Sequence, residues 1–388
     1  MPTAVIVDAI RTPLGRRNGK LKDWHPVDLA AETLNALIDR TGVDPGIIDD
    51  VVMGCVMQVG EQAVNVARNA VLAAGWPETV PGTTIDRQCG SSQQAAHFAA
   101  QGVIAGAYDV VVAAGVEVMT RVPMGASMVD GKFGFPFGPR VGARYAPSGG
   151  LVPQGISAEL IADKWGLSRD DLDAFGVRSQ QNAARATAEG RFQAEILPVL
   201  GADGEMMSVD EGLRETTLES LGKLKPVFKQ GGSVTAGNAS PMNDGAAAML
   251  VMSPRGIELS QTTPMARIVS RATSGVDPHL YGIGPVEAAR TALRRAGIGW
   301  GDVSAVELNE AFAAQSLACL REWPELDPAI VNQQGGAIAI GHPLGCSGVR
   351  IVTTLAHHLR RTGGRYGLAA MCIGVGQGIA IVIENLTT

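Results

Sequence analysis

The feature that most constrains the fold of this chain is an alternation of short apolar runs with longer helical patterns. Runs rich in Val, Ile and Ala occupy residues 3–10, 51–56 and 108–116, and helical patterns occupy residues 26–40 and 91–104. Such alternation is typical of parallel strands connected by helices that cover both faces of a sheet. We therefore predict an α/β fold.

The composition agrees with a layered α/β enzyme of more than one domain. The chain has 388 residues, of which 46% are hydrophobic and only 4% aromatic, together with 49 glycines. A length of this order predicts two or three domains at roughly 150 residues each. Abundant glycine beside Ala and Val indicates tight strand-to-helix turns and close packing of helices on a sheet.

The regular alternation is interrupted between residues 121 and 233, where Gly, Pro and aromatic residues are frequent, as in the segment 133–137. This region also contains a helical pattern at 168–189, with Ser168 as its N-cap and acidic residues in its first turn. We predict an inserted loop or lid domain here.

A faint internal repeat flanks the insertion. A glycine turn at 89–92 opens a helix that leads to the strand 109–115, and a turn at 345–348 opens a helix that leads to the strand 366–372. We therefore predict two homologous βαβ halves that face each other. The predicted domains are 1–120 plus 234–256, the loop domain 121–233, and 257–388.

Charge and cysteine content limit the partners and the compartment. The net charge is −6 with both signs interspersed, so nucleic acid or an anionic membrane is not expected as the main partner. The five cysteines form no CxxC pair, which favours free thiols in a reducing compartment. The N-terminus lacks the pattern of a signal peptide, and no run reaches the ~20 apolar residues of a membrane span. We expect a soluble, cytoplasmic protein.

Cys89 is the first candidate catalytic residue because it lies at the junction of a predicted strand and a predicted helix. Free N–H groups and the partial positive charge of a helix N-terminus lower the pKa of a thiol. Ser91 and Ser92 are placed to cap that helix. The polar residues Arg87 and Gln88 favour a reactive thiol over a buried packing cysteine.

Two further glycine turns present an imidazole and a second thiol. His342 lies between Gly341 and Pro343, and Cys372 ends an apolar strand that runs into a glycine-rich turn. A histidine on a rigid turn is suited to activating a nucleophile, and a thiol at a strand end to acid/base work. By contrast, we expect His357 and His358 to be solvated on a charged helix. Cys55, Cys319 and Cys346 are expected to be packing residues.

These turns, together with a polar pair after an apolar strand, resemble the signatures of the thiolases, the acetyl-CoA C-acyltransferases. The resemblance covers nearly the whole chain, and all four motifs occur in the family's order. They lie at 86–92 (DRQCGSS), 307–312 (ELNEAF), 341–348 (GHPLGCSG) and 371–376 (MCIGVG), and the segments 8–13, 234–240 and 243–245 also match. The resemblance implies duplicated βαβ halves in a layered αβαβα architecture with an inserted loop domain.

The resemblance also implies roles for the candidate residues. Cys89 would take the acyl group as a thioester, His342 would activate it, and Cys372 would be the acid/base. Asn309 would hold a water that forms one oxyanion hole with His342, and the N–H groups of Cys89 and Gly374 would form the second. The structural alternative for Asn309 and its neighbour Glu310 is a helix cap.

Coenzyme A and acyl-CoA are implied as substrates, with no tightly bound cofactor and no metal. A homodimer or homotetramer is implied, and the aromatic loop 133–137 is compatible with subunit contacts or with lid packing. Ser240, Ala236 and Phe228 resemble positions that contact pantetheine, Phe312 resembles the wall beside the acyl group, and Arg214 and Ser220 are candidates for the nucleotide end of coenzyme A.

The direction of the reaction is less constrained. Pro153 and Gln154 stand where biosynthetic members resemble one another in carrying a His-Met pair, which favours a degradative 3-ketoacyl-CoA thiolase of fatty acid or sterol side-chain β-oxidation. A biosynthetic acetoacetyl-CoA thiolase is the alternative.

A β-ketoacyl synthase would use two histidines with its cysteine, and a non-catalytic lipid-binding relative would not need Cys89, His342 and Cys372. The first predicted strand is not followed by a GxGxxG motif and a later acidic residue, which disfavours a dinucleotide-dependent reductase.

Overall fold

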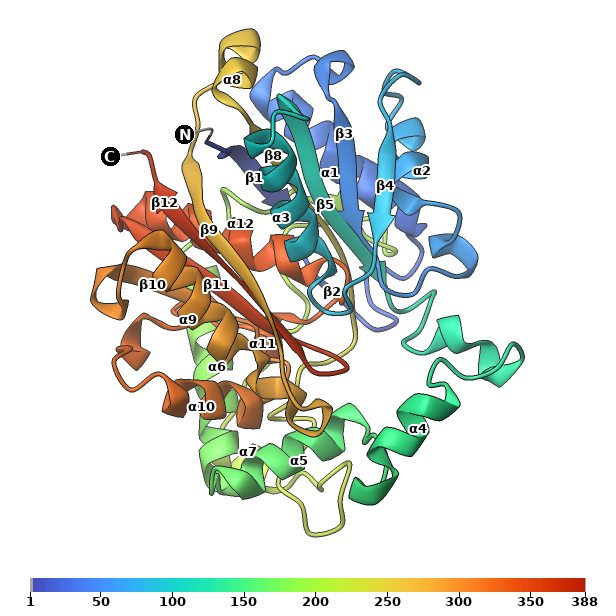
Figure 1. Ribbon diagram of the computed structural model, residues 1–388, viewed down its shortest axis with the longest axis vertical. Coiled ribbons are helices and arrows are strands. Elements are labelled where there is room, and N and C mark those ends of the chain that lie inside the picture. The colour runs from blue at the N-terminus through green and yellow to red at the C-terminus, as the bar shows by residue number, and fades with distance from the viewer. Residues whose placement is uncertain (1–2, 388) are drawn as a thin grey trace.

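A computed structural model describes residues 3–387 and contains one large mixed sheet with helices on its faces (Figure 1). The strand order is β10-β11-β12-β9-β1-β8-β5-β3-β4, with β2 paired to β8, and β6 and β7 form a separate small sheet. The strands are β1 (Val5–Arg11), β2 (Gly15–Arg16), β3 (Asp50–Gly54), β4 (Gly82–Ile85), β5 (Val110–Val118), β6 (Val199–Leu200), β7 (Met206–Met207), β8 (Asn243–Met252), β9 (Ala266–Gly275), β10 (Val303–Leu308), β11 (Tyr366–Ile373) and β12 (Gln377–Asn385).

The sheet consists of two halves with the same strand order, which confirms the predicted duplication. In the first half β3 pairs parallel with β5, which pairs antiparallel with β8, which pairs antiparallel with β1. In the second half β10 pairs parallel with β11, which pairs antiparallel with β12, which pairs antiparallel with β9. Within the sheet, the described part of the chain joins the two halves by pairing β1 with β9, at Val5 with Arg267 and Ile6 with Ala266.

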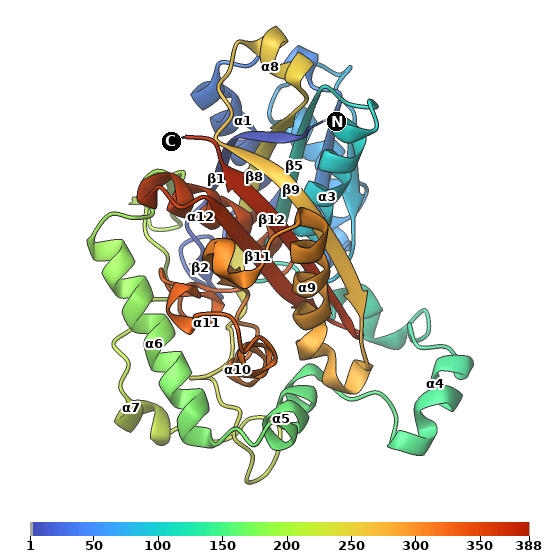
Figure 2. The same ribbon diagram turned by 60° about the vertical axis from the view of Figure 1, so that its left-hand side comes forward.

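The helices complete five layers. Helices α3 and α12 lie between the two halves of the sheet (Figure 2). Their buried side chains share one core with residues of β1, β5, β8, β11 and β12. Helices α1 and α2 cover the outer face of the first half, and α9 covers that of the second. The helices of the two halves are α1 (Pro26–Thr41), α2 (Val66–Ala73), α3 (Ser91–Ile104), α8 (Pro254–Ser260), α9 (Gly284–Ala296), α10 (Ala313–Glu322), α11 (Ala337–Ile340) and α12 (Ser347–Thr362).

The central position of α12 corrects one expectation. His357 and His358 were expected to be solvated, but only 5% and 4% of their surfaces are exposed. The Nε2 atom of His357 lies 2.8 Å from the carbonyl oxygen of Ala9. The helix carries histidines and arginines at its C-terminal end, yet it is covered on both sides by sheet, so a charged sequence does not mark an exposed helix here.

Glycine permits the close contact between the two central helices. A Cβ atom built on Gly348 in α12 would lie 2.1 Å from the backbone nitrogen of Gln93 in α3. A Cβ atom on Gly115 in β5 would lie 2.2 Å from the carbonyl oxygen of Gly345, just before α12. Backbone therefore meets backbone at this contact, and any side chain would force the elements apart.

The chain leaves the sheet after β5 and returns to it at β8, and the segment between them forms the lower part of the molecule in Figure 1. It contains α4 (Pro139–Tyr145), α5 (Gln154–Lys164), α6 (Arg169–Ala188) and α7 (Leu218–Gly222). The predicted cap of α6 is confirmed, since Ser168 and Asp171 form a capping box. Helices α5 and α6 pack on α10 and α11 of the second half. Within residues 3–387, no helix has the length and apolar character that crossing a membrane requires.

We predict that Gly348→Ala destabilises the protein, because its methyl group would collide with the backbone of α3. The free energy of unfolding should fall by about 2 kcal/mol or more in urea titrations followed by circular dichroism. The matched control is Gly142→Ala in α4, where a Cβ atom would meet nothing within 4 Å. That variant should stay within about 1 kcal/mol of the parent. Equal effects of the two substitutions would contradict the close-contact interpretation.

Candidate active site

Cys89 lies at the start of α3, in a turn that follows β4. Gln88 adopts a left-handed backbone (φ 46°), and Gly90 is the N-cap of α3. Neither serine caps the helix as expected. The Ser91 hydroxyl accepts from the Arg87 N–H (2.9 Å) and donates to the Gln88 carbonyl (2.6 Å). Ser91 therefore closes the turn on itself and fixes the position of the thiol.

Ser92 joins the two central helices instead of capping one of them. Its hydroxyl oxygen accepts a hydrogen bond of 2.9 Å from the backbone N–H of Val349 in the first turn of α12. Cys89 lies in the turn before α3, and His342 lies in the turn that leads to α12. This bond therefore holds together the helix N-termini next to the candidate nucleophile and base.

Burial dominates the ionisation of Cys89. Desolvation raises the pKa of its thiol to about 11, although the N–H groups of Gly374 and of Cys89 itself act to lower it. The expectation that the helix N-terminus would lower this pKa below its ordinary value is therefore wrong. Cys89 is only 4% exposed. The free-energy cost of removing water from the thiolate exceeds the stabilisation that the local N–H groups provide.

His342 is held as a neutral imidazole with a defined tautomer. Its Nδ1 lies 2.6 Å from the hydroxyl of Ser347, which donates its own hydrogen to the Pro343 carbonyl (2.8 Å). The hydroxyl must therefore accept from Nδ1–H, which leaves the lone pair on Nε2. Burial, and then the charge of Arg350, lower the pKa of His342 to about 3. The Nε2 atom can thus act as a base at neutral pH.

Asn309 lies beside this base at the end of β10. Its Nδ2 is 3.4 Å from His342 Nε2, and its buried Oδ1 meets no hydrogen-bond partner within the described part of the chain. An unpaired buried amide oxygen next to an imidazole nitrogen is the arrangement expected of a water site.

Glu310 has a structural role that is not that of a helix cap. Its carboxylate accepts hydrogen bonds from Ser179 (2.6 Å), Asn332 (2.8 Å) and the backbone N–H of Ile338 (3.2 Å). Helix α10 begins after Phe312 with no side-chain cap. Glu310 therefore ties α6 to the segment that leads through α11 to His342.

Cys372 and Gly374 lie at the end of β11. Cys372 is fully buried, and desolvation together with its proximity to Cys89 raises its pKa well above the ordinary value. The backbone N–H of Gly374 acts to lower the pKa of the Cys89 thiol. Val375 follows with a φ of 66°, a costly conformation for a β-branched residue that typically occurs at functional turns.

A cavity of about 990 Å³ lies at this site. Its lining includes Cys89, His342 and Gly374, together with the predicted coenzyme A contacts Arg214, Phe228, Ala236, Ser240 and Phe312. Cys372 and Asn309 are buried and are not part of this lining. Ser220 lies outside it, at the exposed start of α7, where its backbone N–H is capped by Thr217.

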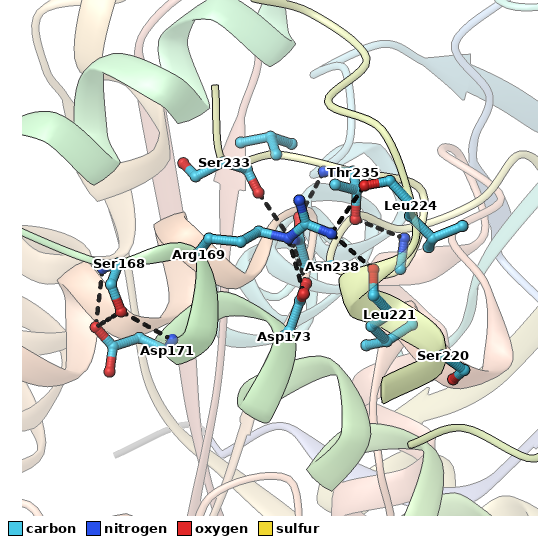
Figure 3. A network of polar contacts seen from close by, with 12 residues as sticks. Ser168, Arg169, Asp171, Asp173, Ser220, Leu221, Leu224, Ser233, Thr235 and Asn238 are labelled. Carbon is cyan, nitrogen blue, oxygen red and sulfur yellow. Dashed lines mark hydrogen bonds and ion pairs between the residues drawn. The ribbon is translucent and has the colours of Figure 1, made fainter. Parts of the chain in front are cut away.

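A polar network anchors the loop that carries Ala236 and Ser240 (Figure 3). Asp173 of α6 accepts from Arg169 Nε (2.7 Å) and from Asn238 Nδ2 (2.8 Å). Asn238 Oδ1 accepts from the backbone N–H of Thr235 (2.9 Å). The guanidinium of Arg169 also donates to the carbonyls at the end of α7. The loop and α7 are thereby fixed to one helix of the inserted segment.

Residues that the sequence did not reveal complete the site. Tyr281 lines the cavity with a buried hydroxyl, and its raised pKa reflects burial and its proximity to Cys372 and Cys89. Glu117 accepts from the backbone N–H groups of Val56, Met57 and Gly345 and so joins the two halves. Only Glu117 left a signal in the sequence, as the lone acidic residue within the apolar strand β5.

The family assignment follows from sequence comparison. The thiolase N-terminal domain matches residues 4–255, and the thiolase C-terminal domain matches residues 262–385. The chain therefore belongs to the thiolase family of acyltransferases.

Similar proteins cover the full chain. A 3-ketoacyl-CoA thiolase of Pseudoalteromonas translucida is 48% identical over 100% of both chains. A steroid 3-ketoacyl-CoA thiolase of Mycobacterium tuberculosis is 44% identical over 100% of this chain and 95% of its own. The structure of human mitochondrial 3-ketoacyl-CoA thiolase in complex with CoA has a TM-score of 0.90 at 39% identity and covers 99% of this chain and 98% of its own. A Bacillus anthracis acetyl-CoA acetyltransferase has the same TM-score, 0.90, and the same identity, 39%, over 100% of this chain and 99% of its own.

The neutral resting state predicts how the free enzyme reacts with iodoacetamide. The thiolate is the reactive form, and the pKa of Cys89 is about 11. The alkylation rate should therefore rise roughly tenfold per pH unit between about pH 7 and pH 10. Mass spectrometry of the intact protein measures the alkylation rate. The Cys89→Ala variant measures the background alkylation of the other thiols. A rate that is already constant above neutral pH would indicate a preformed thiolate–imidazolium pair and contradict this description.

Proposed function

We propose that the protein catalyses the CoA-dependent thiolytic cleavage of 3-ketoacyl-CoA through an acyl-enzyme on Cys89. The observation that carries the proposal is the meeting of the Cys89 thiol, a neutral His342 and the Gly374 N–H at one large cavity. Membership of the thiolase family and the CoA complex of the human relative support coenzyme A as the substrate.

In the first half-reaction, Cys89 attacks the 3-keto carbon while its proton passes to His342 Nε2. The N–H groups of Cys89 and Gly374 stabilise the oxyanion that forms at this carbon. The C2–C3 bond then breaks, and the electron pair moves onto the thioester as an enolate. Asn309, through a water, and His342 stabilise the enolate oxygen, and Cys372 gives its proton to C2 to release acetyl-CoA.

In the second half-reaction, a new coenzyme A transfers its thiol proton to the Cys372 thiolate and attacks the acyl group on Cys89. The tetrahedral intermediate collapses with Cys89 as the leaving group, and His342 returns the proton to Cys89. All protons are restored at the end of the cycle. The resting pair is neutral, so charge develops only when substrate fills the cavity and donors are already in place.

Five of the six residues predicted to contact coenzyme A line the cavity. Ala236, Ser240 and Phe228 would contact the pantetheine arm, and Phe312, which packs edge-on against Phe228, would form the wall beside the acyl group. Arg214 would meet the nucleotide end. Ser220 would contact coenzyme A only outside the cavity, since it is not part of the lining.

The degradative direction is favoured over acetoacetyl-CoA synthesis. Gln154 stands at the start of α5, and its amide nitrogen would lie 3.4 Å from a Cβ atom built on Gly374. By resemblance, Pro153 and Gln154 stand where biosynthetic members carry a His-Met pair, and both residues line the cavity. The names of the relatives, which include 3-ketoacyl-CoA and steroid 3-ketoacyl-CoA thiolases, support the same direction. The intact set of Cys89, His342 and Cys372 disfavours a non-catalytic lipid-binding role.

We also propose a homodimer or homotetramer that works in the cytoplasm. Phe133 and Phe135 are 82% and 76% exposed, which favours subunit contacts for the outer part of the aromatic loop. All five cysteines are free and buried, in keeping with a reducing compartment.

The direct test is thiolysis of acetoacetyl-CoA by purified variants. Cys89→Ala should lower kcat by about 10⁴-fold or more, because the acyl-enzyme cannot form. Cys372→Ala should lower it by about 10²–10⁴-fold, the usual contribution of a general acid/base. The control is Cys55→Ala, which removes a fully buried thiol outside the cavity lining and should stay near the parent rate. Unimpaired thiolysis by Cys89→Ala would refute the proposal.

A further inference from the structure

The segment 138–150 of the inserted region has few polar contacts with the rest of the molecule. It contains α4 and the turn Ala146–Ser148, and every residue of α4 except Tyr145 is exposed. Both views place α4 at the edge of the molecule (Figures 1 and 2). Within residues 3–387, the hydrogen bonds that leave this segment all go to one side chain, that of His279.

His279 belongs to the second half, in the 3₁₀ helix η5 (Pro278–Ile283), and its ring bridges two acceptors. Its Nε2 lies 2.8 Å from the Gly150 carbonyl oxygen. Its Nδ1 lies 3.0 Å from Asp277 Oδ1, which also accepts from the His279 backbone N–H at 2.9 Å. Neither oxygen carries a hydrogen, so both ring nitrogens must donate. The ring that makes both contacts is therefore an imidazolium.

These two contacts favour the charged form of the ring. The hydrogen bond to Asp277, and then that to Gly150, raise the pKa of His279 above its ordinary value, whereas partial burial acts the other way. Because the imidazolium is the bonded form, its contribution is fully present below the ordinary pKa of histidine, about 6.5. It is lost as the pH rises through the raised value.

Few other ionisable groups lie around this contact. The ring of Tyr145 is tilted against that of His279 at 5.6 Å, and the guanidinium of Arg144 lies over the outer ring. Lys164 of α5 acts on Asp277 and helps to lower the pKa of that carboxyl. Within the described part of the chain, Asp277 is the charge that acts on the pKa of His279.

The same histidine holds both ends of a segment that lines the cavity. Residues 151–154 are part of the lining. Gly150, which accepts from the ring, lies just before them, and Ser157, whose hydroxyl donates to the His279 carbonyl at 2.6 Å, lies just after them. Loss of the bond to Gly150 would therefore free one end of this wall.

The opposite side of the contact is fixed. The N–H of Val276, just before Asp277, donates to the Gly376 carbonyl at 2.8 Å, in the turn that follows Cys372. A Cβ atom built on Gly376 would lie 2.5 Å from the Val276 carbonyl oxygen, so backbone packs on backbone here. The Asp277–His279 pair is thus mounted on the turn beside the candidate acid/base, and the segment 138–150 is the part that can move.

We propose that His279 is a positioning residue that fastens the segment 138–150 beside the cavity as a pH-dependent latch, closed when its ring is protonated and released when the proton is lost to water. The neutral ring has one N–H, so it can no longer bond Asp277 and Gly150 together. This proposal goes beyond the proposed function, because it concerns the position of the insertion and holds for any reaction at Cys89.

The first measurement is amide hydrogen exchange of the segment 138–150 by mass spectrometry, corrected for the intrinsic exchange rate at each pH. Protection should fall by about three- to tenfold between about pH 6 and about pH 9. His279→Leu should have the low protection at both values, and Asp277→Asn should move the midpoint to lower pH, because it removes the charge that raises the pKa of His279. The control is His25→Gln, which changes a half-buried histidine outside the cavity lining and should keep the parent's pH dependence.

Protection that does not change with pH in the parent, or that changes equally in His279→Leu, would overturn the proposal. Sedimentation velocity at both pH values tests the other explanation. If protection is lost only where subunits dissociate, a second copy of the chain holds the segment and the latch is refuted.

The second measurement is the KM for acetoacetyl-CoA. Residues 151–154 line the cavity, so substrate should bind less tightly when the segment is released. The KM of His279→Leu should exceed that of the parent by about threefold or more at pH 6 and approach it at pH 9, with kcat within about twofold. A KM ratio that is the same at both pH values would contradict the latch. A parent enzyme that cleaves no thioester refutes the proposed function, and hydrogen exchange then decides on the latch alone.

Discussion

The site depends on the close contact of α3 and α12 at the centre of the molecule. Gly348 and Gly345 let the backbone of α12 and its preceding turn touch α3 and β5, and Ser92 and Glu117 accept hydrogen bonds across the same contact. Each half of the duplicated fold contributes one of these helices. The contact therefore brings together Cys89 from one half and His342 from the other, although they lie far apart in the sequence.

The second consequence of this central position is dehydration. Sheet and helix surround Cys89, His342 and Cys372, so burial raises the pKa of both thiols and lowers that of the imidazole. The thiols and the imidazole of this site are neutral at rest, and in the proposed mechanism the fixed N–H groups and the Asn309 amide stabilise the negative charge that forms there. Low polarity makes such donors more effective, because no bulk water competes with them.

Local signals in the sequence were sufficient for much of the fold. The bounds 91–104 were predicted as they occur in α3, because a glycine turn precedes this helical pattern. The turns with Cys89, His342 and Cys372 were recognisable for the same reason. What failed depended on tertiary burial: His357 was taken as solvated, and the thiol of Cys89 as acidic. Ser347 and Tyr281 were missed, since a serine after a turn and a tyrosine in a loop have no distinguishing pattern.

The central claim is that the Cys89 thiol, and no other group, receives the acyl chain at this junction of the two halves. The most direct test is incubation of the protein with radiolabelled acetyl-CoA at low free coenzyme A, followed by proteolysis and mass spectrometry of the labelled peptides. The account predicts one acetyl group per chain, in thioester linkage on Cys89 and released by added coenzyme A. An acetyl group on another residue, or none on the folded protein, would contradict it.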